Sequence, residues 1–239
     1  MLSNIIVTTN TATEAWDQWW QAMNFQARMG VRMPSRVGDV VGEVLNAITV
    51  ILKPREGFVD SDKRKLSAKY AVGELLWYLS GSNRLSDIKP YSKFWENISD
   101  DGCTLNSAYG YRIFKQFGFD QWEHVKNLLI NDGFSRQAVI HIKDASNAVT
   151  KDTPCTVALQ YQLRENKLFA TTFMRSNDIW LGFPYDVFSF TSLQVLMAME
   201  LGVDVGAYTH ISGSLHLYER DVKNATESSP EAIGQAQPV

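Results

Sequence analysis

TPCTVALQYQLRENKLFATTFMRSNDIWLGFPYD, residues 153–186, is the stretch on which the rest of the chain depends. Two apolar-rich runs flank the polar segment Arg164–Lys167, which is typical of a β-hairpin. Cys155 stands at the start of the first run, and Arg175 stands at the end of the second. A turn that contains glycine and proline then leads to Asp186. The hairpin is therefore expected to bring a thiol, a guanidinium and a carboxyl group to one end of a sheet.

Size and composition indicate an ordinary globular protein. The chain has 239 residues, of which 45% are hydrophobic, and a formal net charge of −3. That length suffices for one large domain with a substantial core. No basic run predicts a nucleic-acid or anionic-membrane surface, and no apolar stretch is long enough to span a membrane. We expect neither a membrane nor a nucleic acid as a required partner.

The two cysteines and the N-terminal residues indicate the cellular compartment in which the protein is expected to work. Cys103 and Cys155 could form one disulfide, but the first residues lack the basic region of a signal peptide. Two free thiols in a reducing cytoplasm are therefore favoured. The four histidines and two cysteines show no metal-ligand spacing, so no metal site is expected.

The pattern of elements predicts one α+β domain over residues 1–221. Residues 222–239 are polar and small, and we expect them to form a flexible tail. Thr11 and Glu14 predict a capping box at the start of an amphipathic helix. Strands are expected at 4–9, 40–52, 138–142 and 208–218, and helices at 62–80, 122–129 and 186–201, the last ended by Gly202.

One ionisable side chain lies inside an apolar helical run. Residues 70–79 read YAVGELLWYL, and Glu74 is the carboxylate among residues that are apolar almost all round, which predicts a buried helix. Burial is expected to raise the pKa of Glu74 into the range of a general acid or base. The alternative is a structural hydrogen bond or an edge position that reaches solvent.

Several of these residues resemble the active-site signature of thymidylate synthases. The resemblance covers roughly residues 36–221 and implies the α+β fold of that family, a mixed β-sheet with a long buried helix and a homodimer formed through the sheet. The matching motifs are Pro154-Cys155, Gln160, Arg175-Ser176 with Asp178, Leu181-Gly182 with Pro184, His216 with Tyr218, and the Glu74 helix.

Three departures from that signature resemble phage deoxycytidylate hydroxymethylases. Thr156 follows the cysteine where synthases usually carry histidine, and Asn177 stands in the Arg-Ser-Asn-Asp run. Asp186 stands where synthases carry the asparagine that reads the pyrimidine. Gly213–His216 is also similar to that branch.

The resemblance implies a role for each site residue. The catalytic residues would be Cys155, Glu74 and Asp186, and the folate-binding residues Trp95, Tyr109 and Gly182. Arg136 would reach the phosphate site of the partner subunit, although Gln137 replaces the second arginine of the family there. The substrate-binding residues would be Arg36, Arg136, Arg175, Ser176, Asn177, Asp178, Gln160, His216 and Tyr218.

The chemistry expected of Cys155 is covalent catalysis. Addition of a thiolate at carbon 6 of a pyrimidine makes carbon 5 nucleophilic towards a one-carbon electrophile. A nearby cation, Arg175 by resemblance, is expected to lower the pKa of the thiol. Without the flanking motifs, an inert buried cysteine would be favoured.

Asp186 is expected to select the base. An ionised aspartate accepts from the cytosine amino group, and a protonated one also donates to N3. Uracil would leave buried polar groups unpaired, at a cost of roughly 1–3 kcal/mol each. A second role, as the N-cap of a helix over residues 187–201, is also physically sound.

The expected activity is 5-hydroxymethylation of deoxycytidylate with 5,10-methylenetetrahydrofolate as carbon donor. The loss of a second family tryptophan, replaced by about Ile98, and Thr156 favour water over hydride in the last step. Alternatives are deoxycytidylate methylation, deoxyuridylate modification, a ribonucleotide substrate and a non-catalytic nucleotide- or RNA-binding relative.

Overall fold

A mixed β-sheet carries the functional residues. The computed structural model describes residues 2–145 and 150–222. Within that part the sheet has eight strands in the order β1-β3-β8-β6-β5-β4, with β2 beside β3 and β7 beside β8. β3 and β8, β5 and β6, and β4 and β5 are antiparallel, whereas β6 and β8 are parallel. The predicted α+β fold with a mixed sheet is therefore confirmed.

The strands have the following bounds: β1 Leu2–Ser3, β2 Ile6–Thr9, β3 Val40–Ile51, β4 Val139–His141, β5 Thr156–Arg164, β6 Lys167–Met174, β7 Asn177–Asp178 and β8 Asp204–Tyr218. The helices are α1 Ala12–Arg28, η1 Pro54–Glu56, α2 Ala68–Ser80, α3 Leu85–Ile88, α4 Phe94–Ile98, α5 Tyr109–Phe114, α6 Gln121–Asn131 and α7 Phe183–Leu201.

The hairpin β5–β6 confirms the prediction from residues 153–186. Glu165 and Asn166 form the two-residue turn, with φ of 50° and 57°. Positive φ at both positions is the conformation of a turn that matches the twist of the strands. The register pairs Arg164 with Lys167 at the turn and Thr156 with Met174 at the far end. The residues that precede β5 and follow β6 therefore lie side by side.

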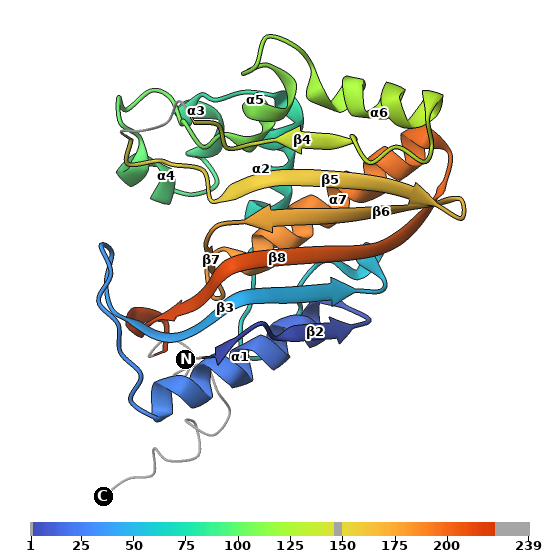
Figure 1. Cartoon of the computed structure of the whole chain (residues 1–239). Coiled ribbons are helices and arrows are strands. Elements are labelled where there is room, and N and C mark those ends of the chain that lie inside the picture. Colours follow the sequence, from blue (N-terminus) through green and yellow to red (C-terminus); the bar gives the residue numbers. More distant parts are fainter. Residues whose placement is uncertain (1, 146–149, 223–239) are drawn as a thin grey trace, which may run out of the picture.

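Helix α7 is the long buried helix of the fold. It packs on β6 and β8, behind the sheet as Figure 1 shows it. Val187, Leu193 and Met197 are fully buried. Gln194 Nε2 donates to the backbone oxygens of Leu168 at 2.9 Å and Gly206 at 3.0 Å, which ties the helix to both strands.

The helix ends predicted from the sequence agree with the structure in part. The Thr11–Glu14 capping box is present, and Gly202 ends α7 with a left-handed φ of 67°. Helix α2 begins at Ala68 and not near 62, because Ser67 is the N-cap and accepts from the backbone N of Tyr70. The predicted tail, residues 222–239, lies outside the described residues except for Val222.

The expectation that α2 is buried on nearly all sides is wrong. Val72, Leu76 and Leu79 are 48%, 56% and 40% exposed, whereas Glu74 and Trp77 are 5% and 4% exposed. The helix therefore has one buried face that carries Glu74 and one apolar face on the surface.

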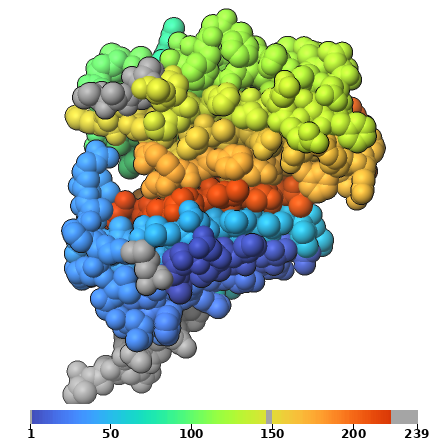
Figure 2. Space-filling model, viewed as in Figure 1, coloured from blue at the N-terminus to red at the C-terminus, as the bar shows by residue number. Residues whose placement is uncertain are grey.

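One face of the sheet is not covered by the helices. In Figure 1 the strands β5, β6, β8 and β3 lie in front of α7 and α2, and Figure 2 shows these strands at the surface on that side. Three half-buried apolar side chains share a row on that face, because Ile48 pairs with Ile211 and Ile211 pairs with Phe173.

Gly110 lets α5 approach α2. A Cβ at Gly110 would lie 1.9 Å from the backbone oxygen of Tyr78. We expect Gly110→Ala to lower the free energy of unfolding by about 3 kcal/mol, because backbone atoms must move to relieve the clash. Gly133→Ala is the matched control, because its Cβ would lie 3.4 Å from Leu163 Cδ2. Equal denaturation midpoints for the two variants would contradict this packing.

Candidate active site

The thiol and the guanidinium meet at the open end of the β5–β6 hairpin. The backbone N of Arg175 donates to the backbone O of Cys155 at 2.9 Å. Arg175 Nε donates to Pro154 O at 3.0 Å, and its Nη2 lies 3.6 Å from Cys155 Sγ. The guanidinium is therefore held against the thiol by backbone groups of the same segment.

The electrostatic prediction for Cys155 is wrong in its net direction. Burial raises the pKa of the Cys155 thiol, Arg175 lowers it, and the carboxyl groups of Asp186 and Asp152 raise it further. The nearby cation acts in the expected sense, but desolvation outweighs it. Both cysteines are free, as expected, and Cys103 is exposed.

Glu74 is a buried carboxyl group, as predicted. It is 5% exposed, and Tyr70 OH donates to its Oε1 at 2.6 Å. Burial raises the pKa of Glu74 to about 8, against the lowering effect of the Tyr70 hydrogen bond and with a further rise from Asp186. The alternative of an edge position that reaches solvent is excluded.

Asp186 lies inside the first turn of α7, so the N-cap role is wrong. Gly182 occupies the N-cap position. Asn177 Nδ2 donates to Asp186 Oδ2 at 2.7 Å. Burial raises the pKa of Asp186 to about 7, the Asn177 hydrogen bond lowers it, and Asp178 raises it.

Gly182 makes room for this pair of side chains. A Cβ at Gly182 would lie 3.1 Å from Asn177 Nδ2 and 3.2 Å from Asp186 Oδ2. Such distances are tighter than ordinary van der Waals contacts. A larger residue at 182 would therefore push the amide and the carboxyl group apart.

The thiol and the two buried carboxyl groups belong to one region. Asp186 raises the pKa of both Cys155 and Glu74. Tyr109 OH accepts from the backbone N of Thr156 at 3.3 Å, and the charge of Cys155 contributes to the raised pKa of Tyr109. The structure thus brings together Cys155, Glu74, Asp186, Asn177, Arg175, Gly182 and Tyr109.

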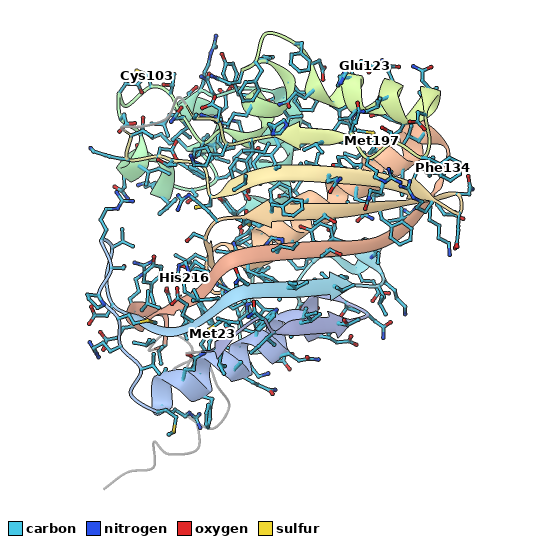
Figure 3. The ribbon with its side chains drawn as sticks, viewed as in Figure 1. Met23, Cys103, Glu123, Phe134, Met197 and His216 are labelled. Carbon is cyan, nitrogen blue, oxygen red and sulfur yellow. The ribbon has the colours of Figure 1, made fainter. Side chains whose placement is uncertain are left out.

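A second group lies at the end of β8, where Figure 3 labels His216. Asp178 of β7 pairs with His216, and the His216 and Tyr218 rings are 4.9 Å apart. Asp178 Oδ1 accepts from the backbone N of Trp180 at 2.8 Å. Burial lowers the pKa of His216, and Asp178 opposes that effect. The Arg175–Asp178 segment therefore joins this group to the thiol.

Four predicted residues lie at the margin of this region or away from it. Arg36 is exposed, on the loop whose Val37 O accepts from Arg220 Nη1 at 3.2 Å. Ser176 is half-buried beside Arg175. Gln160 Nε2 donates to Arg136 O at 3.3 Å, and Arg136 is exposed.

Gln160 points away from the core that Tyr161 enters. Its strand partners, Thr171 and Val139, are half-buried, whereas Leu159 and Tyr161 are buried. Side chains alternate between the two faces of a strand. Gln160 therefore belongs to the uncovered face, and the structure does not place it with the thiol.

Trp95 of α4 packs near the Glu74 helix. Its ring lies 5.3 Å from that of Trp77, in an edge-on arrangement. Its buried Nε1 lies beside the Tyr70 hydroxyl, which donates to Glu74.

Sequence reasoning missed two kinds of residue. Tyr70 stands four positions before Glu74, a helical spacing that predicts contact and could have identified it. Tyr208 and His210 are fully buried on β8. Their spacing of two residues indicates a shared face, but only the packing against Asn177 shows what they contact.

Over residues 2–145 and 150–222, no group of three histidine, cysteine or acidic side chains is arranged to hold a metal ion. Within the same ranges, none of the helices combines the length and apolarity needed to cross a membrane.

The buried carboxyl group of Glu74 is expected to make stability depend on pH. Its pKa is about 8 in the folded state and about 4.5 in the unfolded state. The folded state therefore holds the extra proton, and stability falls as pH rises from 4.5 through 8. In urea unfolding, Glu74→Gln should reduce this pH-dependent loss in the free energy of unfolding by on the order of 3 kcal/mol. Glu165→Gln in the exposed turn is the control, and an unchanged slope in Glu74→Gln would contradict the assignment.

Comparisons with known proteins agree with this geometry. The chain is 35% identical over 173 residues to a deoxyuridylate hydroxymethyltransferase of Bacillus phage SP01, covering 66% of this chain and 45% of that protein. It is 29% identical over 219 residues to a deoxyuridylate hydroxymethyltransferase of Pseudomonas phage M6, covering 90% of this chain and 62% of that protein. The chain thus spans about half to three-fifths of the length of these relatives.

A solved structure has the same fold. The thermostable thymidylate synthase A from Bacillus subtilis superposes with a TM-score of 0.75 at 23% identity, covering 91% of this chain and 83% of that one. The thymidylate synthase family model matches residues 49–233. With the thiol, the arginine and the buried carboxyl groups in one region, the chain belongs to the thymidylate synthase family.

Proposed function

We propose that this protein is a pyrimidine-nucleotide one-carbon transferase that converts deoxycytidylate to its 5-hydroxymethyl derivative. The observation that carries the proposal is that Cys155, Glu74 and Asp186 share one region, in which Glu74 is buried and the other two are half-buried. A nucleophile, a general acid or base and a base-reading group are the three functions that the reaction needs.

Cys155 is the nucleophile. Its sulfur bonds to carbon 6 of the pyrimidine, and carbon 5 then attacks the one-carbon unit. The raised pKa of the thiol means that it must lose its proton as the substrate binds. Arg175, at 3.6 Å, stabilises the thiolate once it forms.

Glu74 moves the protons. With a pKa of about 8 it is largely protonated at neutral pH and can donate and then accept. Tyr70, 2.6 Å from Oε1, orients the carboxyl group and lowers its pKa towards neutrality.

Asp186 reads the base. Its pKa of about 7 makes the protonated form accessible at neutral pH. In that form one oxygen accepts from the cytosine amino group while the other donates to N3. Asp186 is held by Asn177, so its orientation is set before the nucleotide arrives.

A deoxyuridylate substrate is the second candidate. Two relatives carry that substrate in their names. A protonated carboxyl group also matches uracil when it accepts from N3–H and donates to O4. The two substrates differ in which oxygen of Asp186 must carry the proton.

The residues present fit a folate co-substrate. The flat ring of Trp95 offers an apolar surface next to the Glu74 helix, 5.3 Å from the Trp77 ring. Trp95, Tyr109 and Gly182 would hold the folate. When bound, 5,10-methylenetetrahydrofolate supplies a one-carbon unit at the oxidation level of formaldehyde.

Water as the final reactant gives the hydroxymethyl product. Water adds to the exocyclic carbon, and the sulfur of Cys155 leaves carbon 6, so no redox step is needed. Thr156 supports this outcome, because its buried hydroxyl lies beside Tyr109 and makes this end of the site more polar.

His216 and Tyr218 would bind the sugar, with Ser176 and Asp178 alongside. Arg36, Arg175 and Arg136 would bind the phosphate, the last of them from a partner subunit. Arg36 lies on an exposed loop beside Arg220, where its guanidinium is free to reach a phosphate.

A homodimer through the sheet explains the uncovered face. The half-buried side chains of Ile48, Ile211 and Phe173 form an apolar row across three paired strands. The backbone of Arg136 lies near the same face, because its O accepts from the Gln160 side chain. A second copy packed on this face would bury the row and bring Arg136 near the other subunit.

A product assay tests the reaction. The protein is incubated with deoxycytidylate or deoxyuridylate and methylenetetrahydrofolate, and the products are resolved by mass. We expect the 5-hydroxymethyl product of deoxycytidylate, and a methyl product would contradict the proposed last step. Asp186→Asn should shift kcat/KM towards deoxyuridylate by about tenfold or more, since one buried hydrogen bond is worth ~1–3 kcal/mol.

Cys155→Ala separates an enzyme from a binding protein. We expect it to abolish turnover and to leave nucleotide binding within about threefold, because the thiol is not needed for the non-covalent complex. Cys103→Ala is the matched control for loss of a thiol, because Cys103 is exposed. Retained turnover in Cys155→Ala would overturn the covalent mechanism. Turnover of the ribonucleotide, measured in parallel in the unaltered protein, shows whether the site distinguishes the 2′ position of the sugar.

A substitution on the uncovered face tests the dimer. Phe173→Lys should give a monomer by light scattering, because a charge would be buried in the interface. Activity should fall at least tenfold with it if Arg136 serves the partner's phosphate. Phe25→Lys on α1, where Phe25 is 63% exposed, is the control for a surface charge. A dimeric Phe173→Lys variant would show that this face is not the interface.

A further inference from the structure

A chain of hydrogen bonds runs from Asp186 into the core. Asn177 Nδ2 donates to Asp186 Oδ2 at 2.7 Å, and Asn177 Oδ1 lies 3.1 Å from His210 Nε2. His210 Nδ1 lies 2.8 Å from Tyr208 OH, which lies 2.8 Å from Thr172 Oγ1. The four groups beyond Asp186 come from β6, β7 and β8.

The chain is closed to solvent. His210 and Tyr208 are 0% exposed, Thr172 is 1% exposed and Asn177 is 3% exposed. Burial lowers the pKa of His210 to about 3, so the ring is neutral in the physiological range. A neutral imidazole has one N–H donor and one acceptor nitrogen. The hydrogen bonds on its two sides must therefore have opposite sense.

The orientation of the Asn177 amide and the direction of the hydrogen bonds along the whole chain depend on each other. With the amide nitrogen of Asn177 on Asp186, the Asn177 oxygen faces His210 and can only accept. His210 must then carry its proton on Nε2, and Nδ1 must accept. Tyr208 has one hydroxyl proton, which the geometry allows it to donate either to Thr172 Oγ1 or to His210 Nδ1. In this sense of the chain the proton goes to Nδ1, and the Thr172 hydroxyl turns to donate to the Tyr208 oxygen.

We propose that His210 and Tyr208 are positioning residues that fix the orientation of the Asn177 amide and so decide which oxygen of Asp186 carries the proton. With Asn177 Nδ2 on Oδ2, that oxygen is an acceptor at every pH, and a proton on the carboxyl group resides on Oδ1. Oδ1 then donates to the nucleotide, and Oδ2 remains free to accept a second hydrogen bond.

Hydrogen bonds that ran along the chain in the opposite direction would change what Asp186 offers to the nucleotide. If Asn177 presented its oxygen to Asp186, Oδ2 would have to carry the proton and direct it at Asn177. The nucleotide would then meet an acceptor at both positions, which mismatches cytosine at N3. The chain thus acts on base reading without touching the base, and a wrong sense leaves buried polar groups unpaired.

The pH behaviour of Asp186 also reflects its charged and titratable neighbours. Asp178 acts on it from β7. Its charge is felt by groups of four other elements or their ends: Tyr70, Glu74 and Tyr78 of α2, Tyr109 of α5, Cys155 before β5 and Tyr208 of β8.

The first test uses the unaltered protein and needs no substrate. Nitrogen-15 NMR of the histidine rings reports which nitrogen of His210 is protonated, with His210→Gln used only to assign the signal. We expect the proton on Nε2. A proton on Nδ1 would reverse the chain and overturn the proposal, whatever the enzyme's substrate is.

The second test measures deoxycytidylate binding against pH by calorimetry. In the unaltered protein, affinity should be full at low pH and fall as pH rises through about 7, where Asp186 loses its proton. Tyr208→Phe removes the donor to His210 Nδ1, so the hydrogen bonds no longer hold the Asn177 amide in one orientation. We expect about tenfold weaker binding at pH 6, since one buried hydrogen bond is lost. The midpoint should also move to higher pH, because the Asn177 N–H no longer stabilises the carboxylate.

Tyr161→Phe is the matched control, because Tyr161 is 1% exposed on β5 and lies outside the chain. It should leave the affinity and the midpoint unchanged. An unshifted midpoint in folded Tyr208→Phe would overturn the proposal, and if that variant does not fold, the NMR result decides. The binding test rests on the proposed function: if the unaltered protein binds neither deoxycytidylate nor deoxyuridylate, that function fails, while the proton position in His210 is measured independently.

Discussion

The burial of Glu74 and Asp186 in one poorly solvated region is the constraint around which the site is built. Desolvation is the main cost of ionising both carboxyl groups, Asp186 adds to that cost for Glu74, and Asp178 adds to it for Asp186. Each also has one side-chain donor, Tyr70 for Glu74 and Asn177 for Asp186, which partly restores ionisation. The result is two groups that titrate near neutrality beside a thiol, an environment suited to proton transfer.

The sheet delivers these groups from distant parts of the sequence. The β5–β6 register sets Cys155 against Arg175, and the parallel pairing of β7 with β8 sets Asp178 against His216. The residues between these two pairs form the segment 175–178. Because that segment is short, the thiol end and the His216 end lie close together, as the proposed binding of a base at one end and a sugar at the other requires.

Much of the site was predictable because its chemistry is concentrated in local patterns. The hairpin follows from a polar turn between two apolar runs, and the burial of Glu74 follows from its apolar neighbours along the helix. Two local predictions were wrong because tertiary contacts decided them. Asp186 is not an N-cap, since α7 begins at Phe183, and the pKa of Cys155 is raised because the depth of burial outweighs the neighbouring cation.

By itself the sequence determined the family and the hairpin, and it singled out Cys155, Glu74 and Asp186 as the proposed nucleophile and carboxyl groups, because each of these inferences depends on residue type and short-range spacing. Only the tertiary structure decided which partners those groups have. Hydrogen bonds such as Asn177 to Asp186 and His210 to Asn177 join residues 9 and 33 positions apart. Contacts of that kind depend on strand register and helix packing, which no local pattern of residues encodes.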